Sequence, residues 1–236
     1  FDNIRKFVIY LLSGNAGEIL IVGLAALAGA PLPLLPLQVL YLNAINDVFP
    51  ALALGVGQAN PATMERPPRD AGEAIITRRG WWVIALYGAL IAAPVLGVFA
   101  LALGPLRMST TEAVSVSFLG LALGRLWHVF NMRVPGTAIV RNEVTRNPLV
   151  WGALVLSAGL ITIAVYTPGL DTVLGLTHPG AVGWTLALAA SVVPLVVGQI
   201  ALGLLGIGLT LPYFFRTVEE LISGLERDFL VLLAGM

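Results

Sequence analysis

Three ionisable residues interrupt long apolar stretches of this sequence, where a charge is costly. They are Glu18, Asp47 and Arg125. Placing a charged side chain at the centre of a bilayer costs at least ~2.5–3.5 kcal/mol on insertion scales, so such residues normally face other protein and take part in function. These three are therefore the first candidates for the chemistry of the protein.

Amide side chains accompany both acids at helical spacing. Asn15 and Glu18 are three residues apart, which places them on one face of a helix. Asn43, Asn46 and Asp47 stand at positions i, i+3 and i+4 and share a face in the same way. A turn of seven residues joins the two helices, so we expect antiparallel neighbours whose polar faces converge. Carboxylate and amide oxygens suit hard cations or protons and not soft metals.

Pro50 is expected to loosen the second of these helices beside its acid. Proline has no N–H to donate to the carbonyl four residues earlier, which is that of Asn46. Irregular backbone at membrane depth is tolerated where it lines a cavity or is buried in protein, and transporters use such breaks to coordinate ions. A second interpretation stays open, in which the amides and acids only hydrogen-bond neighbouring helices.

The elements that position these residues are predicted to be membrane-spanning helices. Apolar residues make up 58% of the chain and charged residues 11%, where a soluble domain has roughly 25% charge. The mean hydropathy is +0.91. Spanning the hydrocarbon core takes about 20 apolar residues, and six stretches meet that requirement. They lie at about residues 7–29, 37–56, 81–103, 113–132, 149–166 and 182–208.

The predicted fold is therefore all-α, a polytopic bundle of six transmembrane helices over residues 1–208. Residues 209–236 alternate apolar and acidic positions at helical spacing, which predicts an amphipathic tail lying on the cytoplasmic membrane surface. Basic residues orient the bundle, because cytoplasmic connections carry an excess of Lys and Arg. Eleven of the thirteen basic residues fall on one side of the six-span arrangement, so both termini are predicted to be cytoplasmic.

Composition also excludes several classes of partner and site. Acidic and basic residues cancel, so no net charge favours nucleic acid. The chain has no Cys and two His, which excludes a thiolate site and leaves no cluster for zinc. The lipid bilayer is the partner that the sequence itself predicts.

Two segments resemble the fifth and sixth membrane helices of P-type cation-transporting ATPases. Residues 2–18 (DNIRKFVIYLLSGNAGE) resemble the entry to the fifth helix, and residues 36–55 (PLQVLYLNAINDVFPALALG) resemble the sixth. Residues 60–61 (NP) and 64–69 (MERPPR) look like the loop that follows in those pumps. Residues 130–133 (FNMR) and 141–143 (RNE) look like the loop after the eighth helix. The likeness is greatest to the calcium-pump branch and its bacterial relatives.

The resemblance implies a function for the whole chain. It implies the last six membrane helices of a pump that couples ATP hydrolysis to cation transport, in a bacterial plasma membrane. It also implies that a transported cation, calcium or another hard cation, is held at five positions: Asn15, Glu18, Asn43, Asn46 and Asp47. The partner would be the N-terminal portion of the pump, with its first four membrane helices and its actuator, phosphorylation and nucleotide domains.

Two departures and one absence qualify the resemblance. Calcium pumps usually carry Thr at the position of Asn46, and an acid or amide near that of Arg125. We expect Arg125 to act as an internal counter-charge that pairs with Glu18 or Asp47, the alternative being that it extends to the headgroups. The phosphorylation motif Asp-Lys-Thr-Gly-Thr does not occur in these 236 residues. The chain alone is thus expected not to be catalytic, and Mg-ATP to bind only in the cytoplasmic domains.

Two other functions remain open on the sequence alone. A self-contained secondary transporter, coupled to a cation or a proton, would use the same acids. A membrane scaffold without transport would be indifferent to the loss of Glu18 and Asp47.

Overall fold

The structure is a computed structural model that describes residues 2–57 and 74–205. The described residues are helical and contain no strand. Six helical segments in them are long and apolar enough to cross a membrane, which confirms the six predicted spans. They are Asp2–Leu27, Pro36–Gly55, Arg78–Leu103, Thr110–Met132, Pro148–Tyr166 and Gly180–Leu205. The predicted tail 209–236 lies outside the described residues.

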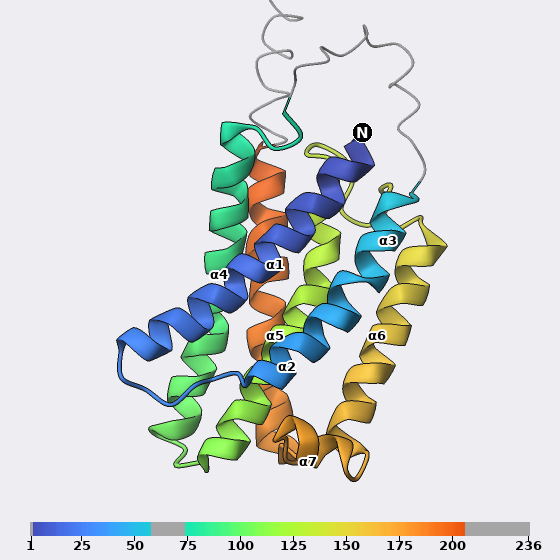
Figure 1. Ribbon diagram of the computed structural model, residues 1–236. Coiled ribbons are helices and arrows are strands. Elements are labelled where there is room, and N and C mark those ends of the chain that lie inside the picture. The colour runs from blue at the N-terminus through green and yellow to red at the C-terminus, as the bar shows by residue number, and fades with distance from the viewer. Residues whose placement is uncertain (1, 58–73, 206–236) are drawn as a thin grey trace, which may run out of the picture.

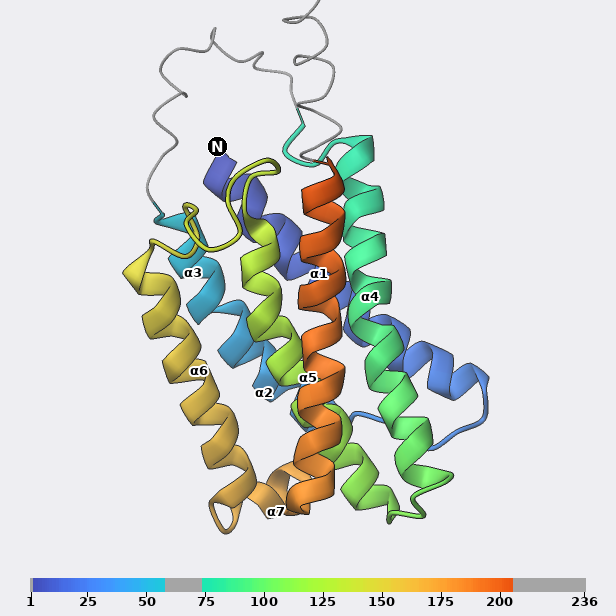
Figure 2. The same cartoon turned by 180° about the vertical axis from the view of Figure 1, so that it is seen from behind.

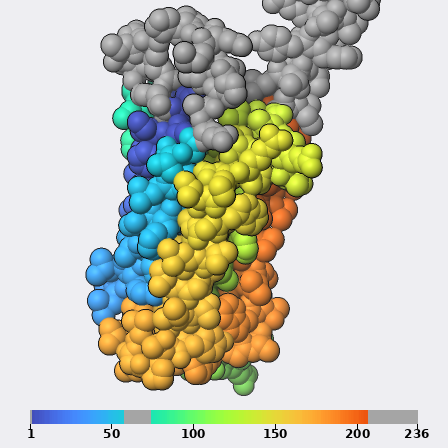
Figure 3. Space-filling view, turned by 90° about the vertical axis from the view of Figure 1, so that its right-hand side faces the viewer, coloured from blue at the N-terminus to red at the C-terminus, as the bar shows by residue number. Residues whose placement is uncertain are grey.

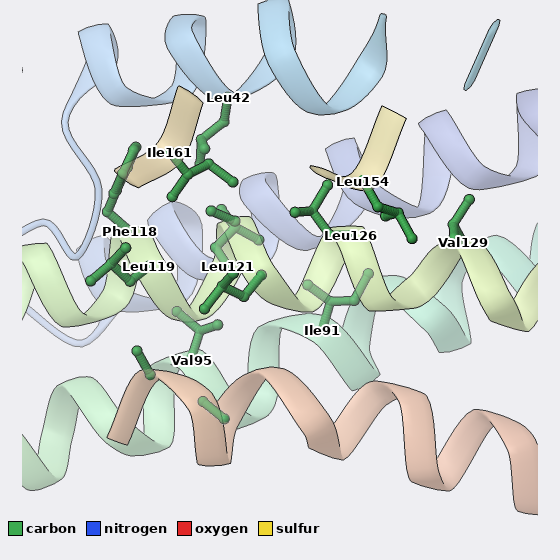
Figure 4. Packing of buried hydrophobic residues seen from close by; sticks show 14 of the residues in the cluster. Leu42, Ile91, Val95, Phe118, Leu119, Leu121, Leu126, Val129, Leu154 and Ile161 are labelled. Atoms are coloured by element: carbon green, nitrogen blue, oxygen red, sulfur yellow. The ribbon is translucent and has the colours of Figure 1, made fainter. Parts of the chain in front are cut away.

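The central element is α5 (Thr110–His128), which continues as a 3₁₀ turn to Met132. Nearly all of its residues are buried, because α4 (Arg78–Leu103), α6 (Pro148–Tyr166) and helix Gly180–Leu205 pack around it (Figures 1 and 2). In the close view of Figure 4, Leu121 and Leu126 of α5 lie among side chains of the neighbouring helices. Any polar group on α5 is therefore held inside the bundle.

Helix α1 (Asp2–Leu27) crosses α4 obliquely and at close range (Figure 1). A Cβ atom added at Gly88 of α4 would lie 2.8 Å from the Cβ of Ala16. Small residues at a crossing let two backbones approach, which is how membrane helices commonly pack without a hydrophobic driving force. This crossing fixes the half of α1 that carries Glu18.

The second span is broken into three pieces at its middle. Helix α2 (Pro36–Leu42) leads into a π-helical segment, Asn43–Asp47, and α3 (Phe49–Gly55) follows. The loosening expected between Asn46 and Pro50 is present, but the irregular backbone begins a turn earlier, at Asn43. The physical reason is that Pro50 both removes a donor and crowds the preceding turn, and a wider π turn relieves that crowding.

The broken span is tied to its neighbours by side-chain hydrogen bonds. Tyr41 donates to the carbonyl of Leu160 in α6 at 2.8 Å. Gln38 donates to the carbonyl of Leu174 at 2.9 Å, in the short helix α7 (Leu170–Leu174) between α6 and the last span. Figure 3 shows α6 running alongside α2 and α3, with the segment around α7 below them. The π-helical segment itself contacts α6 on one side, and on the other side it accepts a hydrogen bond from Tyr10 of α1.

Large aliphatic side chains cover the outward faces of the bundle. Ile19 of α1 and Val155 of α6 are each 72% exposed. Such faces suit a lipid environment, since lipid tails cover apolar side chains that water would not. The start of α1 and the end of helix Gly180–Leu205 lie at the same end of the bundle (Figures 1 and 2).

Candidate cation site

Arg125 lies near the end of α5 and is 1% exposed. Its Nη1 donates to Glu18 of α1 and, at 3.1 Å, to the Oδ1 of Asn43. Its Nη2 donates to Asp47 at the end of the π-helical segment. The guanidinium thus bridges two carboxylates from different helices. We call these four residues (Glu18, Asn43, Asp47 and Arg125) the Arg125 cluster.

The glycine at position 14 makes room for this guanidinium. A Cβ atom there would lie 2.6 Å from both Nε and Nη2 of Arg125, closer than real Cβ contacts come. Gly14 precedes Glu18 by four residues, so both face α5 from the same side of α1. Gly14 is not among the residues predicted from the sequence, although its four-residue spacing from Glu18 is a signal that the sequence contains.

Asn15 and Asn46, the two remaining predicted ligands, make no hydrogen bond to Arg125 in the described part of the chain. Asn46 is fully buried, and its Nδ2 donates to the carbonyl of Ala122 in α5 at 3.2 Å. Asn15 lies on α1 one turn before Glu18. The Oδ1 atoms of Asn15 and Asn46 are both buried, and neither has a hydrogen-bond partner among the residues that the structure describes. Two unpartnered amide oxygens therefore lie on the same helical segments as the two carboxylates.

Tyr10 donates a hydrogen bond to the Asn46 carbonyl, which Pro50 leaves without its helical donor. The hydroxyl of Tyr10 donates to the carbonyl oxygen of Asn46 at 3.1 Å, and the Tyr10 side chain is 1% exposed. Its ring stacks on the buried ring of His128, with centroids 5.9 Å apart. The freed carbonyl beside Asp47 is thus satisfied by α1, a contact between distant segments that no local spacing indicated.

The charges of the cluster do not cancel. Two carboxylates face one guanidinium, so one negative charge remains when all three groups are ionised. Within residues 2–57 and 74–205, no group of three or more His, Cys, Asp or Glu side chains could hold a metal ion. Any cation bound here would therefore need amide oxygens as well as the two carboxylates. A mixed oxygen set of this kind suits hard cations.

A further ion pair lies at the end of the bundle where α1 begins, between the first turns of α1 and the connection that precedes α6. Lys6 contacts Glu143 at 2.8 Å, with side chains that are 18% and 27% exposed. Glu143 also accepts a hydrogen bond from the backbone N–H of Val134 at 2.6 Å. Burial raises the pKa of Glu143, but the hydrogen bonds from Lys6 and from the backbone outweigh burial and lower that pKa.

Comparison with known proteins gives a family match over most of the chain. A family described as "Cation transporting ATPase, C-terminus" matches residues 31–202. The matched region includes the π-helical segment and Arg125, while α1 lies before it.

Individual relatives are similar over most of the chain. A calcium-transporting ATPase of Bacillus subtilis (strain 168) is 33% identical over 194 residues, which are 82% of this chain and 22% of that protein. A calcium-transporting ATPase of Listeria monocytogenes is 32% identical over 81% of this chain and 22% of its own length. A P-type sodium-transporting ATPase of Plasmodium falciparum is 44% identical over 90 residues, 38% of this chain and 7% of that protein. The chain spans about a fifth of the length of the bacterial relatives it matches.

Proposed function

Because this chain belongs to the family of cation-transporting ATPase C-termini, we propose that it is the cation-coordinating membrane domain of an ATP-driven pump. The observation that carries the proposal is the Arg125 cluster, in which Arg125 bridges the buried carboxylate of Glu18 and the partly exposed carboxylate of Asp47. Unpartnered amide oxygens lie on the same two helical segments. The family match favours this function over a self-contained secondary transporter or a scaffold.

In this proposal the cation ligands are Asn15, Glu18, Asn43, Asn46 and Asp47. The π-helical segment supports it, because interrupted helices at membrane depth recur at the ion sites of transporters. The transported ion is calcium or another hard cation. Relatives named for calcium and for sodium both support a hard cation.

The hydrolytic chemistry belongs to the rest of the pump. We place Mg-ATP in an N-terminal portion that carries the actuator, phosphorylation and nucleotide domains and the first four membrane helices. Phosphoryl transfer needs groups outside the membrane that position phosphates and metal ions. The Arg125 cluster lies within the spans and does not supply such groups. We further propose that both ends of the bundle's chain face the cytoplasm and that the pump resides in a bacterial plasma membrane.

Arg125 acts in this proposal as a built-in counter-charge. A guanidinium that bridges Glu18 and Asp47 offsets one of their two negative charges. A site with one net negative charge holds fewer, or lower-valence, cations than the same site with an acid at position 125. The alternative, in which Arg125 extends to the headgroups, does not fit a side chain that is 1% exposed.

Neutralising each acid tests the ligand assignment. Glu18→Gln and Asp47→Asn, introduced into the complete pump, should each lower the cation affinity measured by cation-dependent phosphorylation at least tenfold, while membrane insertion stays intact. Glu112→Gln is the matched control, because Glu112 lies in the exposed first turn of α5, away from the cluster. Unchanged cation affinity in both variants would remove these carboxylates from the site.

Counting ions tests the counter-charge. We expect about one divalent cation bound per phosphorylated pump, and more in Arg125→Gln, because that substitution restores one negative charge to the site. The measurement is a titration of bound cation against phosphoenzyme in both proteins. Two divalent ions per cycle in the unmodified pump, unchanged by the substitution, would rule the counter-charge out.

A further inference from the structure

A groove of about 1100 Å³ opens at the end of the bundle where α1 begins. Its walls are the first turns of α1 and α4, the connection from Asn131 to Leu149, and the last turns of helix Gly180–Leu205. None of the residues of the Arg125 cluster lines it. The groove is therefore separate from the candidate cation site.

The two parts of the groove differ in chemistry. Its rim carries six basic residues and two acidic ones, of which Glu143 is already paired with Lys6. Its deeper wall is apolar and is formed by Leu86 and Leu90 of α4 with Val197 and Leu205 of the last helix. Leu86 is 64% exposed and Leu205 is 44% exposed, so this wall is open on the outward face of the bundle.

The arginines of the rim differ in whether their donors are already used. The donors of Arg133 are used, because this buried side chain donates to Gln199 and to the carbonyl of Thr137, both at 2.7 Å. Arg79, Arg141 and Arg146 are exposed instead, and in the described part of the chain their side chains make no hydrogen bond or ion pair. The rim is thus an exposed, positively charged edge above an apolar wall.

We propose that this groove binds an anionic phospholipid. The phosphate lies at the rim against Arg141 and Arg146, and the acyl chains lie along α4 and helix Gly180–Leu205. Basic pockets between membrane helices bind acidic head groups at the cytoplasmic side, where anionic lipids are abundant. Guanidinium groups hold phosphate oxygens through paired, charge-assisted hydrogen bonds.

A lipid explains both parts of the groove together. A free phosphate ion would use the rim but would leave the open wall of Leu86 and Val197 uncovered. A neutral lipid would cover the wall but would leave the charge of the rim unused. Only a molecule with an anionic head and apolar chains complements both.

Lipid binding to the complete pump tests the proposal. The pump is purified in detergent, titrated with phosphatidylglycerol or phosphatidylcholine, and bound lipids are counted by native mass spectrometry. We expect preferential binding of phosphatidylglycerol. Arg141→Gln combined with Arg146→Gln should weaken it by about tenfold or more, since each base near a membrane surface contributes roughly fivefold.

Two further variants separate the rim from the wall. Arg78→Gln combined with Arg107→Gln removes the same charge from exposed residues that do not line the groove, and should leave binding unchanged. Ala201→Trp fills the wall and should weaken phosphatidylglycerol binding with the rim intact.

Three results would overturn the proposal. The first is equal binding of the two lipids. The second is unchanged phosphatidylglycerol binding in the Arg141→Gln, Arg146→Gln variant. The third is absence of bound lipid together with a crosslink from the groove to another part of the pump, which would show that the protein itself fills this space.

Discussion

The Arg125 cluster and the Lys6–Glu143 pair hold opposite charges together at two depths of the same molecule. Arg125 is 1% exposed, whereas the side chains of Lys6 and Glu143 are 18% and 27% exposed. Water can hydrate either partner of the outer pair if the other is lost, but it cannot reach the guanidinium. The energetic value of an ion pair therefore depends on whether water can replace the missing partner.

Burial alone does not make the inner cluster stabilising. Removing charges from water is expensive, and well-packed apolar residues often replace a buried ion pair without loss of stability. Glu18, Asp47 and Arg125 are therefore poorly explained as a device for folding. A site that combines a fixed counter-charge with a transported cation gives them a reason to be there, which is the role we propose.

The largest effect is expected where one partner of the inner cluster is removed. Arg125→Met leaves the buried carboxylate of Glu18 and the partly exposed one of Asp47 without their counter-charge, and should lower the free energy of unfolding by about 3–5 kcal/mol. The measurement is thermal denaturation of the purified protein in detergent without added divalent cation. Added calcium should restore part of the loss, because a bound cation takes the place of the guanidinium.

A triple variant provides the control for this prediction. Arg125→Met combined with Glu18→Gln and Asp47→Asn removes the charges together and should recover most of the stability, since no unpaired charge stays buried. Equal destabilisation in the single and triple variants would mean that packing of the long side chain, and not charge, sets the effect.

A smaller effect is expected from crowding the cluster without changing its charge. Gly14→Ala places a methyl group 2.6 Å from two atoms of the guanidinium, so Arg125 must shift away from α1. Overpacking of this kind typically costs about 1–3 kcal/mol. We expect a lower denaturation temperature and a weaker cation affinity, because Arg125 and its carboxylates move relative to each other.

Gly23→Ala is the matched control on the same helix. No atom lies within 4 Å of the position of its added Cβ, and alanine favours helix over glycine. This variant should be neutral or slightly more stable. If Gly14→Ala behaves in the same way, the close approach of α1 to Arg125 does not constrain the cluster.

The sequence predicted most of the fold, for a reason specific to membranes. A span needs a long apolar run, so hydropathy alone indicated the number and place of the six helices, which the structure confirms. Helical spacing also placed Glu18 and Asp47 on facing helices. Their use as cation ligands, with Asn15, Asn43 and Asn46, stays a prediction.

What the sequence did not predict depends on contacts between distant segments. No local sequence signal indicates that Tyr10 donates to the Asn46 carbonyl, since 36 positions separate the two residues. The place of Gly14 under the guanidinium depends on how closely α1 and α5 approach. Both follow from tertiary packing, which the 3.6-residue period of a single helix does not contain.

The smallest effect is expected at the outer pair. Lys6→Gln should lower the free energy of unfolding at pH 7 by about 0.2–1 kcal/mol, because both side chains are partly hydrated and the pair is screened by salt. Arg78→Gln removes the same charge from the same end, at an exposed residue that makes no ion pair in the described part of the chain, and should have less effect. A loss above about 2 kcal/mol in Lys6→Gln would make the outer pair resemble the inner one.

The pH dependence of the outer pair gives the final test. The folded protein holds the pKa of Glu143 below its usual value, through hydrogen bonds from Lys6 and the backbone that outweigh burial. Ionised Glu143 therefore stabilises the protein above its unfolded pKa, near 4.3, and that contribution is lost as pH falls through the lower folded pKa. Denaturation temperatures measured from pH 7 downward should consequently fall less steeply below about pH 4.3 in Lys6→Gln than in the unmodified protein.

Raising the salt concentration should reduce this difference at the outer pair while leaving the effect of Arg125→Met nearly unchanged, because screening acts on exposed charges far more than on buried ones. Equal salt sensitivity at the two sites would contradict the distinction drawn between them.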